Sequence, residues 1–459
     1  MRNFVLIAFI FLLQSNCHHA FVATSTARRI SNAFYQGKTS SLTHHVPRKP
    51  SSSLFSESGR GGSSNKSGDD NFLLASLKKR AEELETQNEA LLKRWKDAKC
   101  VSKARIVIDD WVRRISLGKW PYIAIGSASG SIYLADCNNC EVIAEVKDIH
   151  SPTGGDEEAL RYLYGAYDGG GTLAIAMRGD IVVSAGREGG AKVFRVVTTE
   201  EDEKNPTKKK FVSVGEIPSL KGALVTSLYL DNEDKLWVGC YDGTLHRFDF
   251  DSEASQKPMM LRLESGVLCV DVNNDIGLVV CGLDNGSVKM FSTDGTVLAL
   301  WKPLSATYAR SVKVVGGPDD NSWCVVAGGG DGQMCARQLL IDSTGTVESV
   351  PFDNKRSTVE FSPLHGGPIV SLATRQGGLL ISGAQDGNLR VWNCWARAED
   401  DDSGYSDFEV KPKILYNFVG YKVWLGSVCT GKDGNCLLSD GSDNAIVVHD
   451  FSVPINYDL

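Results

Sequence analysis

The stretch LLISGAQDGNLRVWN, residues 379–393, has the pattern of a tight β-hairpin. Two apolar segments rich in strand-forming residues flank Asp386-Gly387, a pair that readily adopts the positive backbone φ angles of a short turn. The turn is marked by the phrase Gly-x-x-x-Gly, which runs here from Gly383 to Gly387. How often this phrase recurs decides the fold.

The phrase returns along the chain, each time between two short apolar segments rich in Val, Ile, Leu, Tyr and Cys. Its copies span residues 126–130, 186–190, 239–243, 282–286, 328–332, 383–387 and, in a degenerate form without glycine in either slot, 440–444. The second slot advances by 43 to 60 residues, which suits a four-stranded unit with loops of unequal length. The sequence therefore predicts an all-β chain of seven four-stranded units.

Residues 364–393 resemble a nearly complete repeat of the WD-repeat family, through LHGGPIVSL at 364–372 and the hairpin that follows. Two features depart from the family pattern: the usual Gly-His pair is reversed at His365-Gly366, and the usual Trp-Asp pair is Trp392-Asn393. Counted over seven units, the resemblance covers about three quarters of the chain. It implies a seven-bladed β-propeller over residues 104–459.

The resemblance also implies a structural role for one set of polar side chains in this repeat. In family geometry a hydrogen-bonded tetrad ties the inner strands of a blade to the outer ones, and here it would consist of His365, Ser382, Asp386 and Trp392. A His-Ser-Asp set can be mistaken for a catalytic triad, but no oxyanion-hole motif lies beside it. The sequence also lacks GxSxG, HExxH and Walker lysine motifs, so we expect no catalytic, cofactor-binding or metal-binding residues.

Closure of the ring requires an outer strand for the last blade. Only nine residues follow the final strand-like segment, 445–450. We therefore expect residues 105–108, near the start of the propeller, to supply that strand and leave no open sheet edge.

The N-terminal seventy residues have the composition of a targeting segment. An apolar run at 4–13 is too short for a membrane anchor but fits a signal peptide over residues 1–20, so no membrane span is expected in the mature chain. Residues 21–70 are rich in Ser and Thr, carry more Lys and Arg than acidic residues, and are predicted to be disordered and transit-like. Processing between Ala20 and Phe21 resembles the bipartite plastid presequences of diatom-type algae. The resemblance implies a plastid reached through the secretory route; the alternative is secretion or a secretory-pathway lumen.

A helix is predicted over residues 71–100, because nearly all its residues favour helix. Seven residues alternate at spacings of three and four and form an a/d seam with Asn88 at an a position: Leu74, Leu77, Ala81, Leu84, Asn88, Leu91 and Trp95. This pattern suits a parallel homodimer. The alternative is an amphipathic helix that lies against the propeller or frays in solvent.

Charge and cysteine content limit the environment and the partners. The formal net charge is −7, and the residues after Ser67 carry 41 basic and 55 acidic side chains, so nucleic acid is not an expected partner. Most of the twelve cysteines lie in apolar strand-like runs, which favours buried thiols and argues against an oxidising compartment. The pair Cys137-Asn138-Asn139-Cys140 fits a hairpin turn, with a redox disulfide or a metal site as alternatives.

Three long connections interrupt the repeats. Polar insertions at 198–210 and 398–413 fall between the third and fourth strands of their units and would emerge from one face. The segment 150–171, interpreted as a loop, would rise on the opposite face. It holds residue types enriched at binding hot spots: Arg161, Tyr162, Tyr164 and Tyr167.

These features favour a non-enzymatic scaffold or adaptor that binds partner proteins, because a propeller offers a rigid ring with two faces of variable loops. Two alternatives remain: a secreted or lumenal propeller, and one that binds a small molecule in its central channel. The channel hypothesis requires ionisable residues at the ends of the inner strands, whereas those strands read as mostly apolar with Ser, Thr and Asn.

Overall fold

The structure is a computed structural model that describes residues 67–168, 170–198, 209–250, 258–342, 345–347, 358–397, 408–419, 421, 426–431, 434–442 and 444–452. The predicted signal peptide and nearly all of the transit-like segment, with their Ala20-Phe21 junction, lie outside the described residues. The chain forms two compact units, and the boundary falls within helix α3 between Lys93 and Arg94.

Helix α3 (Ser67–Lys96) confirms the predicted helix, although it begins and ends earlier than the predicted range 71–100. It ends early because Ala98 adopts a left-handed conformation, with φ of 56°, which turns the chain out of the helix. The backbone N–H of Lys99 then donates to the carbonyl of Arg94 at 2.9 Å. Pairing of the heptad seam with a second copy stays a prediction.

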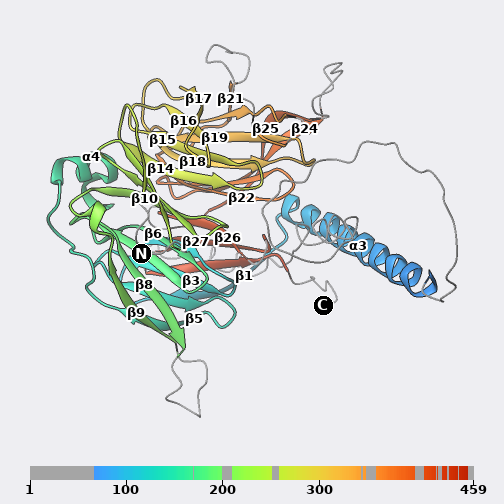
Figure 1. The fold of residues 1–459 in the computed structure, drawn as a ribbon, viewed down its shortest axis with the longest axis horizontal. Helices are drawn as coiled ribbons and strands as arrows, with labels where there is room; N and C mark the ends of the chain where they lie inside the picture. The colour runs from blue at the N-terminus through green and yellow to red at the C-terminus, as the bar shows by residue number, and fades with distance from the viewer. Residues whose placement is uncertain are drawn as a thin grey trace, which may run out of the picture. The chain divides into compact units, whose positions relative to one another are not determined.

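The second unit is a seven-bladed β-propeller, as predicted, and each blade is a four-stranded antiparallel sheet (Figure 1). Blade 1 contains β2 (Val112–Leu117), β3 (Tyr122–Ser127), β4 (Ile132–Asp136) and β5 (Glu141–Val146). Blade 2 contains β6 (Thr172–Arg178), β7 (Ile181–Gly186), β8 (Lys192–Thr198) and β9 (Lys209–Glu216). Blade 3 contains β10 (Val225–Leu230), β11 (Lys235–Cys240), β12 (Thr244–Asp249) and β13 (Met259–Arg262), preceded by the 3-10 turn η1 (Pro218–Leu220).

The remaining blades repeat this order. Blade 4 contains β14 (Val267–Asn273), β15 (Leu278–Leu283), β16 (Val288–Ser292) and β17 (Val297–Trp301). Blade 5 contains β18 (Ala309–Gly316), β19 (Trp323–Gly329), β20 (Met334–Gln338) and β21 (Thr358–Glu360). Blade 6 contains β22 (Ile369–Arg375), β23 (Leu379–Ala384), β24 (Leu389–Arg397) and β25 (Phe408–Phe418). Blade 7 contains β26 (Val428–Gly431), β27 (Cys436–Ser442), β28 (Ala445–Asp450) and, from the other end of the unit, β1 (Val101–Val107).

The pairing of β1 with β28 closes the ring, as the sequence predicted, over a longer strand than the expected 105–108. An aromatic stack lies beside this closure. The rings of Trp95 and Phe451 are 3.7 Å apart and nearly parallel, and both side chains are fully buried. The indole N–H of Trp95 donates to the carbonyl of Gly434 at 3.1 Å. Trp95, a residue of the predicted heptad seam, is therefore part of the propeller core.

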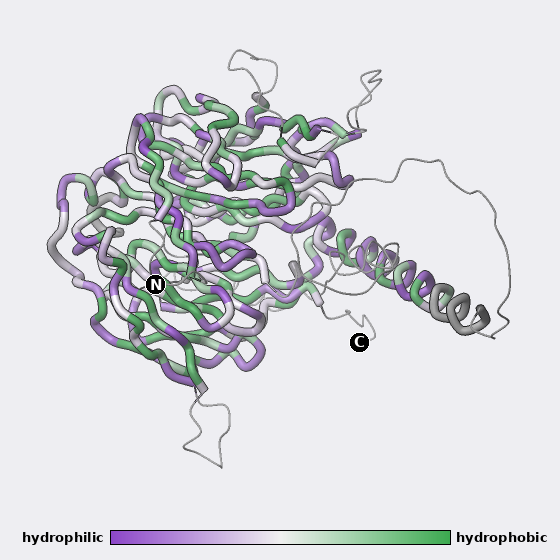
Figure 2. Tube along the Cα trace, in the orientation of Figure 1, coloured by the Kyte–Doolittle hydropathy of each residue, from purple (hydrophilic) through white to green (hydrophobic). Residues whose placement is uncertain are grey.

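The hydrophobic core lies between neighbouring blades. Val280 and Met290 of blade 4, for example, pack in one buried cluster with Val312 and Val325 of blade 5. Hydrophobic stretches accordingly run along the strands of the propeller in Figure 2. Because each fully buried Val, Leu or Ile contributes about 1.5–3 kcal/mol, contacts between blades are the main stabilising interaction of the ring.

The antiparallel order gives the propeller two distinct faces. We call the face where the inner strand of each blade begins the entry face, and the face where it ends the exit face. Connections between blades, and turns between second and third strands, lie on the entry face. The polar insertions join β8 to β9 and β24 to β25 and so leave from the exit face, whereas the segment between β5 and β6 lies on the entry face, as predicted.

Candidate functional site

Helix α4 (Glu157–Asp168) occupies the connection between blades 1 and 2. The sequence interpretation of residues 150–171 as a loop is wrong for this part of the segment. The carboxylate of Asp156 accepts a hydrogen bond from the backbone N–H of Ala159 at 3.0 Å and so caps the helix. Two glutamates in the first turn favour the helix further. Because a run of glycines follows this segment in the sequence, the segment was interpreted as a loop.

One side of α4 is buried against the starts of the inner strands. Leu160, Leu163 and Tyr164 follow the spacing of one helix face and are at most 3 % exposed. They share a cluster with Leu173 of β6 and Leu268 of β14, which belong to blades 2 and 4. Figure 1 shows α4 at one side of the propeller, beside β14. The helix therefore covers the mouth of the ring on the entry face.

Tyr164 lies between two arginines from distant parts of the ring. The guanidinium of Arg114, on β2, is 5.5 Å from the centre of the tyrosine ring, and that of Arg310, on β18, is 4.4 Å away. Arg114 is held in place because its Nε donates to the carbonyl of Leu173 at 2.7 Å. Desolvated cation–π contacts contribute about 2 kcal/mol each, so these pairs tie α4 to blades 1 and 5 as well.

Arg187 fixes the segment that leads into α4. Its guanidinium donates to the carbonyls of Gly154 and Pro152 at 2.7 and 3.0 Å and to the Glu157 carboxylate at 2.6 Å. Gly155 has a φ of +75°, and a Cβ there would lie 2.0 Å from the carbonyl oxygen of Arg187. Only glycine allows this close approach, so the helix is held firmly at its start.

The outer side of α4 presents Arg161 and Tyr162, and the Tyr162 side chain is 53 % exposed. The ring of Tyr162 meets Tyr308 edge to face at 5.7 Å. Partial burial, and then the carboxylate of Asp284, raise the pKa of Tyr162, so its hydroxyl stays protonated. Of the four predicted binding residues, two are at the surface, Tyr164 is in the core, and Tyr167 lies in α4 with a side chain outside the description.

Further apolar side chains are exposed on the entry face, among them Trp111 and Leu364. Trp111 connects blades 7 and 1 and is 51 % exposed, and Leu364 connects blades 5 and 6 and is 53 % exposed. The guanidinium of Arg113 lies 5.6 Å from the Trp111 ring. Neither residue was predicted from the sequence; the signal that could have identified both is their position between an outer strand and the next inner strand.

The structure brings the four predicted tetrad residues together in blade 6. Nε2 of His365 lies 2.8 Å from the Ser382 hydroxyl, which accepts from the indole N–H of Trp392 at 2.9 Å. Nδ1 of His365 lies 3.2 Å from the Asp386 carboxylate. Burial, and then the charge of Arg390, lower the pKa of His365 to about 4. A neutral imidazole with a side chain 1 % exposed is suited to hold strands together.

Blade 2 contains a similar set that sequence reasoning missed. Nε2 of His150 lies 2.9 Å from the Ser184 hydroxyl, and Nδ1 lies 2.6 Å from the Glu188 carboxylate. Burial raises the pKa of Glu188, but the hydrogen bond and charge of His150, together with hydrogen bonds from the backbone and from Lys192, outweigh it and lower the pKa to about 2. Phe194 stands where Trp392 stands in blade 6, and α4 separates His150 from its inner strand, so the repeat is hard to recognise.

The described cysteines form no disulfide with one another, and Cys137 to Cys140 form the predicted turn between β4 and β5. Burial raises the pKa of the Cys137 thiol, which makes it a poor nucleophile. In the part of the chain that the structure describes, no group of three or more His, Cys, Asp and Glu side chains is placed to hold a metal ion. Nor is any helix in that part long and apolar enough to cross a bilayer.

Comparison with known proteins matches one blade. A family model for the WD domain, G-beta repeat, covers residues 358–393, from the outer strand of blade 5 through the first three strands of blade 6. No curated protein matches the chain. With seven four-stranded blades closed into a ring and one blade that matches this repeat, the chain is a WD-repeat β-propeller.

Proposed function

We propose that this protein is a non-enzymatic scaffold or adaptor that binds partner proteins through its entry face. The WD-repeat propeller is consistent with protein interaction, and the observation that carries the proposal is helix α4. It is held rigidly by four blades, yet it presents Arg161 and the half-exposed Tyr162 to solvent. Rigid Tyr, Trp and Arg side chains dominate binding energy at protein interfaces.

The test is affinity capture from the native cell extract with matched variants. The double variant Arg161→Ala, Tyr162→Ala removes the outer side chains of α4 and leaves Leu160, Leu163 and Tyr164 in place. Met260→Ala is the control, because Met260 is 56 % exposed but lies on the outer strand β13. Proteins that the wild type and the control enrich should be lost with the double variant. If the double variant enriches the same proteins as the wild type, the outer side chains of α4 do not bind them.

We also propose that the protein acts in the plastid. The basis is the targeting composition of residues 1–20 and 21–70, the Ala20-Phe21 junction, and the described cysteines of the propeller, which form no disulfide with one another. Residues 1–68 fused to a fluorescent protein should reach the plastid of a diatom, and Phe21→Ala should abolish that delivery. Secretion or a reticular signal from both fusions would instead support the secreted or lumenal alternative.

Dimerisation through residues 71–100 is a further proposal that rests on the heptad and on Asn88. Light scattering on the full chain should give twice the chain mass, and Leu84→Lys should reduce it to the mass of one chain. A single-chain mass for the wild type would contradict the proposal.

A further inference from the structure

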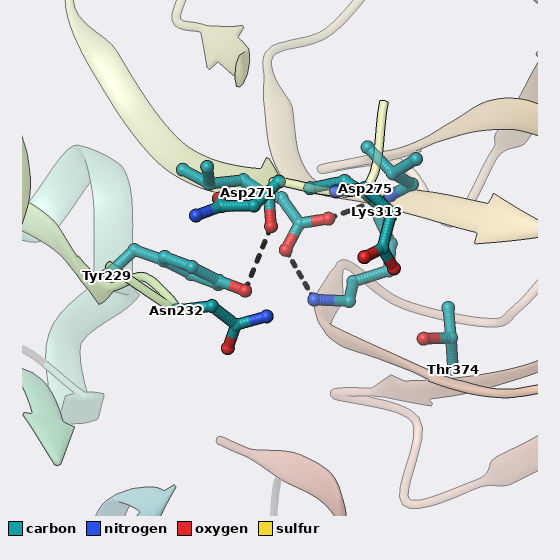
Figure 3. Close-up of a pocket in the computed structure, with 10 residues that line it drawn as sticks. Tyr229, Asn232, Asp271, Asp275, Lys313 and Thr374 are labelled. Carbon is teal, nitrogen blue, oxygen red and sulfur yellow. Dashed lines mark hydrogen bonds and ion pairs between the residues drawn. The ribbon is translucent and has the colours of Figure 1, made fainter. Parts of the chain in front are cut away.

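The exit face holds a small polar pocket at the ends of four successive inner strands. Its volume is about 170 Å³, and Figure 3 shows the side chains around it. It is lined by residues of blades 3 to 5, among them Tyr229, Asn232, Asp271, Asn274, Asp275 and Lys313, and by Thr374 of blade 6. The pocket therefore opens at the mouth of the ring opposite to α4.

An ion pair forms its deepest part. Asp271 is 3 % exposed; one carboxylate oxygen pairs with the Lys313 ammonium and the other accepts from the backbone N–H of Val314 at 2.8 Å. The ammonium also lies 5.6 Å from the centre of the Tyr229 ring. Lysine has three N–H donors, and Asp271 accepts from one of them. The Lys313 side chain is 23 % exposed, so its remaining donors face the pocket.

Two side-chain amides add hydrogen-bond donors, one at the rim and one buried beside the pocket. Arg178 donates to Oδ1 of Asn232 at 2.9 Å and so orients the amide. Its nitrogen therefore faces the same space as the Lys313 ammonium (Figure 3). Nδ2 of Asn274 is buried and, among the described residues, has no hydrogen-bond partner. A buried donor without a partner costs about 1–3 kcal/mol, which a ligand oxygen at this place would recover.

The pocket lining offers mainly hydrogen-bond donors to a ligand. Asp271 is satisfied by its own contacts, and the hydroxyl of Tyr229 donates to the carbonyl of Val272 at 3.0 Å. The remaining carboxylate belongs to Asp275, an exposed residue at the rim. An anionic oxygen group fits the donors of Lys313, Asn232 and Asn274, while a hydroxyl or ammonium group fits Asp275. The volume is close to that of a ~150 Å³ cavity that holds benzene, so it suits about six heavy atoms.

We propose that this pocket binds a small monocarboxylate of about six heavy atoms that also carries a hydroxyl or ammonium donor, a hydroxy or amino acid. The carboxylate contacts Lys313, Asn232 and Asn274, and the second group contacts Asp275. The site lies on the face opposite to the proposed protein-binding helix, so the two proposals succeed or fail separately. Asp271 and Lys313 supply the ionisable residues at inner-strand ends that a channel ligand requires.

The test is ligand-observed NMR with the full chain and lactate or alanine as probes. Saturable binding is expected, with propane-1,2-diol, which lacks the carboxylate, and malonate, which repels Asp275, both at least about tenfold weaker. Asn274→Asp replaces the amide donor by a negative charge of the same shape. The new charge repels the ligand carboxylate, so lactate binding should weaken at least about tenfold. Asn285→Asp is the matched control in an entry-face turn and should leave binding unchanged.

A second variant guards against local distortion at Asn274. Lys313→Met with Asp271→Asn removes the ion pair and keeps an acceptor for Val314, so the fold persists while lactate binding is lost. Three results would overturn the proposal: no saturable binding of lactate or alanine at about 10 mM, equal binding of the diol, or lactate binding insensitive to both variants.

Discussion

The hydrogen-bonded histidines of this propeller show how burial decides the role of a polar set. His365 has the partners of a catalytic histidine, a hydroxyl and a carboxylate, but its side chain is 1 % exposed and its pKa is lowered to about 4. It therefore accepts a hydrogen bond from Ser382 as a neutral ring and donates one to Asp386. This chain of bonds connects the strand β23 and the turn after it with the entry to β22.

Ser382→Ala should lower the free energy of unfolding by about 2 kcal/mol, since it leaves the N–H of Trp392 and Nε2 of His365 buried without partners. Ser184→Ala in blade 2 is the matched comparison and should cost about 1 kcal/mol, since Phe194, unlike Trp392, has no side-chain N–H that would lose its partner. Chemical denaturation followed by intrinsic fluorescence measures both values. Equal losses would contradict the role assigned to the Trp392 bond.

Stability should fall as the pH drops from about 6.5 to about 4. Burial lowers the pKa of both His365 and His449 to about 4, below the value near 6.5 of the unfolded chain. In that window the unfolded state binds protons that the folded state does not, so each histidine costs about 1.4 kcal/mol of stability per pH unit. Denaturation midpoints at pH 7 and pH 4.5 measure the effect. In His365→Gln the midpoint should depend less on pH. A midpoint independent of pH across this window would refute it.

Among the elements, helix α4 is the part that distinguishes this propeller from a bare ring of blades. Its apolar side closes the entry mouth, and Tyr164 carries the contacts to Arg114 and Arg310. The strands were predictable because each blade repeats the same turn phrase, and repetition compensates for weak single copies. Helix α4 occurs once, beside a glycine run that favours a loop, so its burial could not be inferred from local pattern. The pocket residues were missed because their strands come together only in the ring.

Tyr164→Ala should release α4 from the ring and leave the blades folded. Hydrogen exchange of residues 157–168 measures this release, which should greatly increase their exchange rate, because deletion of a buried aromatic ring costs about 3–5 kcal/mol. Tyr162→Ala serves as the control and should leave exchange in α4 nearly unchanged, since that side chain is half exposed. Similar exchange in the two variants would argue against the anchoring role of Tyr164.

Trp95→Ala tests the closure of the ring. The side chain is fully buried, stacks on Phe451 and donates to Gly434, so its loss should lower the free energy of unfolding by about 3–5 kcal/mol. Trp111→Ala makes the same chemical change at a half-exposed site and should cost under about 1 kcal/mol. The two variants are compared by chemical denaturation. A small loss of unfolding free energy in Trp95→Ala would show that this side chain does not stabilise the closed ring.

At the scale of the whole molecule, the two faces of the propeller have different chemistry. The entry face is closed by α4 and exposes Trp111, Tyr162 and Leu364, whereas the exit face opens onto a polar pocket. The seven blades and the closure by β1 could be predicted from the sequence. Which side chains reach the surface could not, because exposure depends on contacts between blades that are far apart in the chain.

The central claim is that partner proteins bind at the outer side of α4. Site-specific photocrosslinking tests it most directly: a photoreactive phenylalanine analogue replaces Tyr162 in one version of the full chain and Met260 in another, and both are irradiated in the native cell. A discrete crosslinked protein from position 162 and none from position 260 is the predicted result. Discrete products from position 260 alone, or from neither position, would contradict the claim.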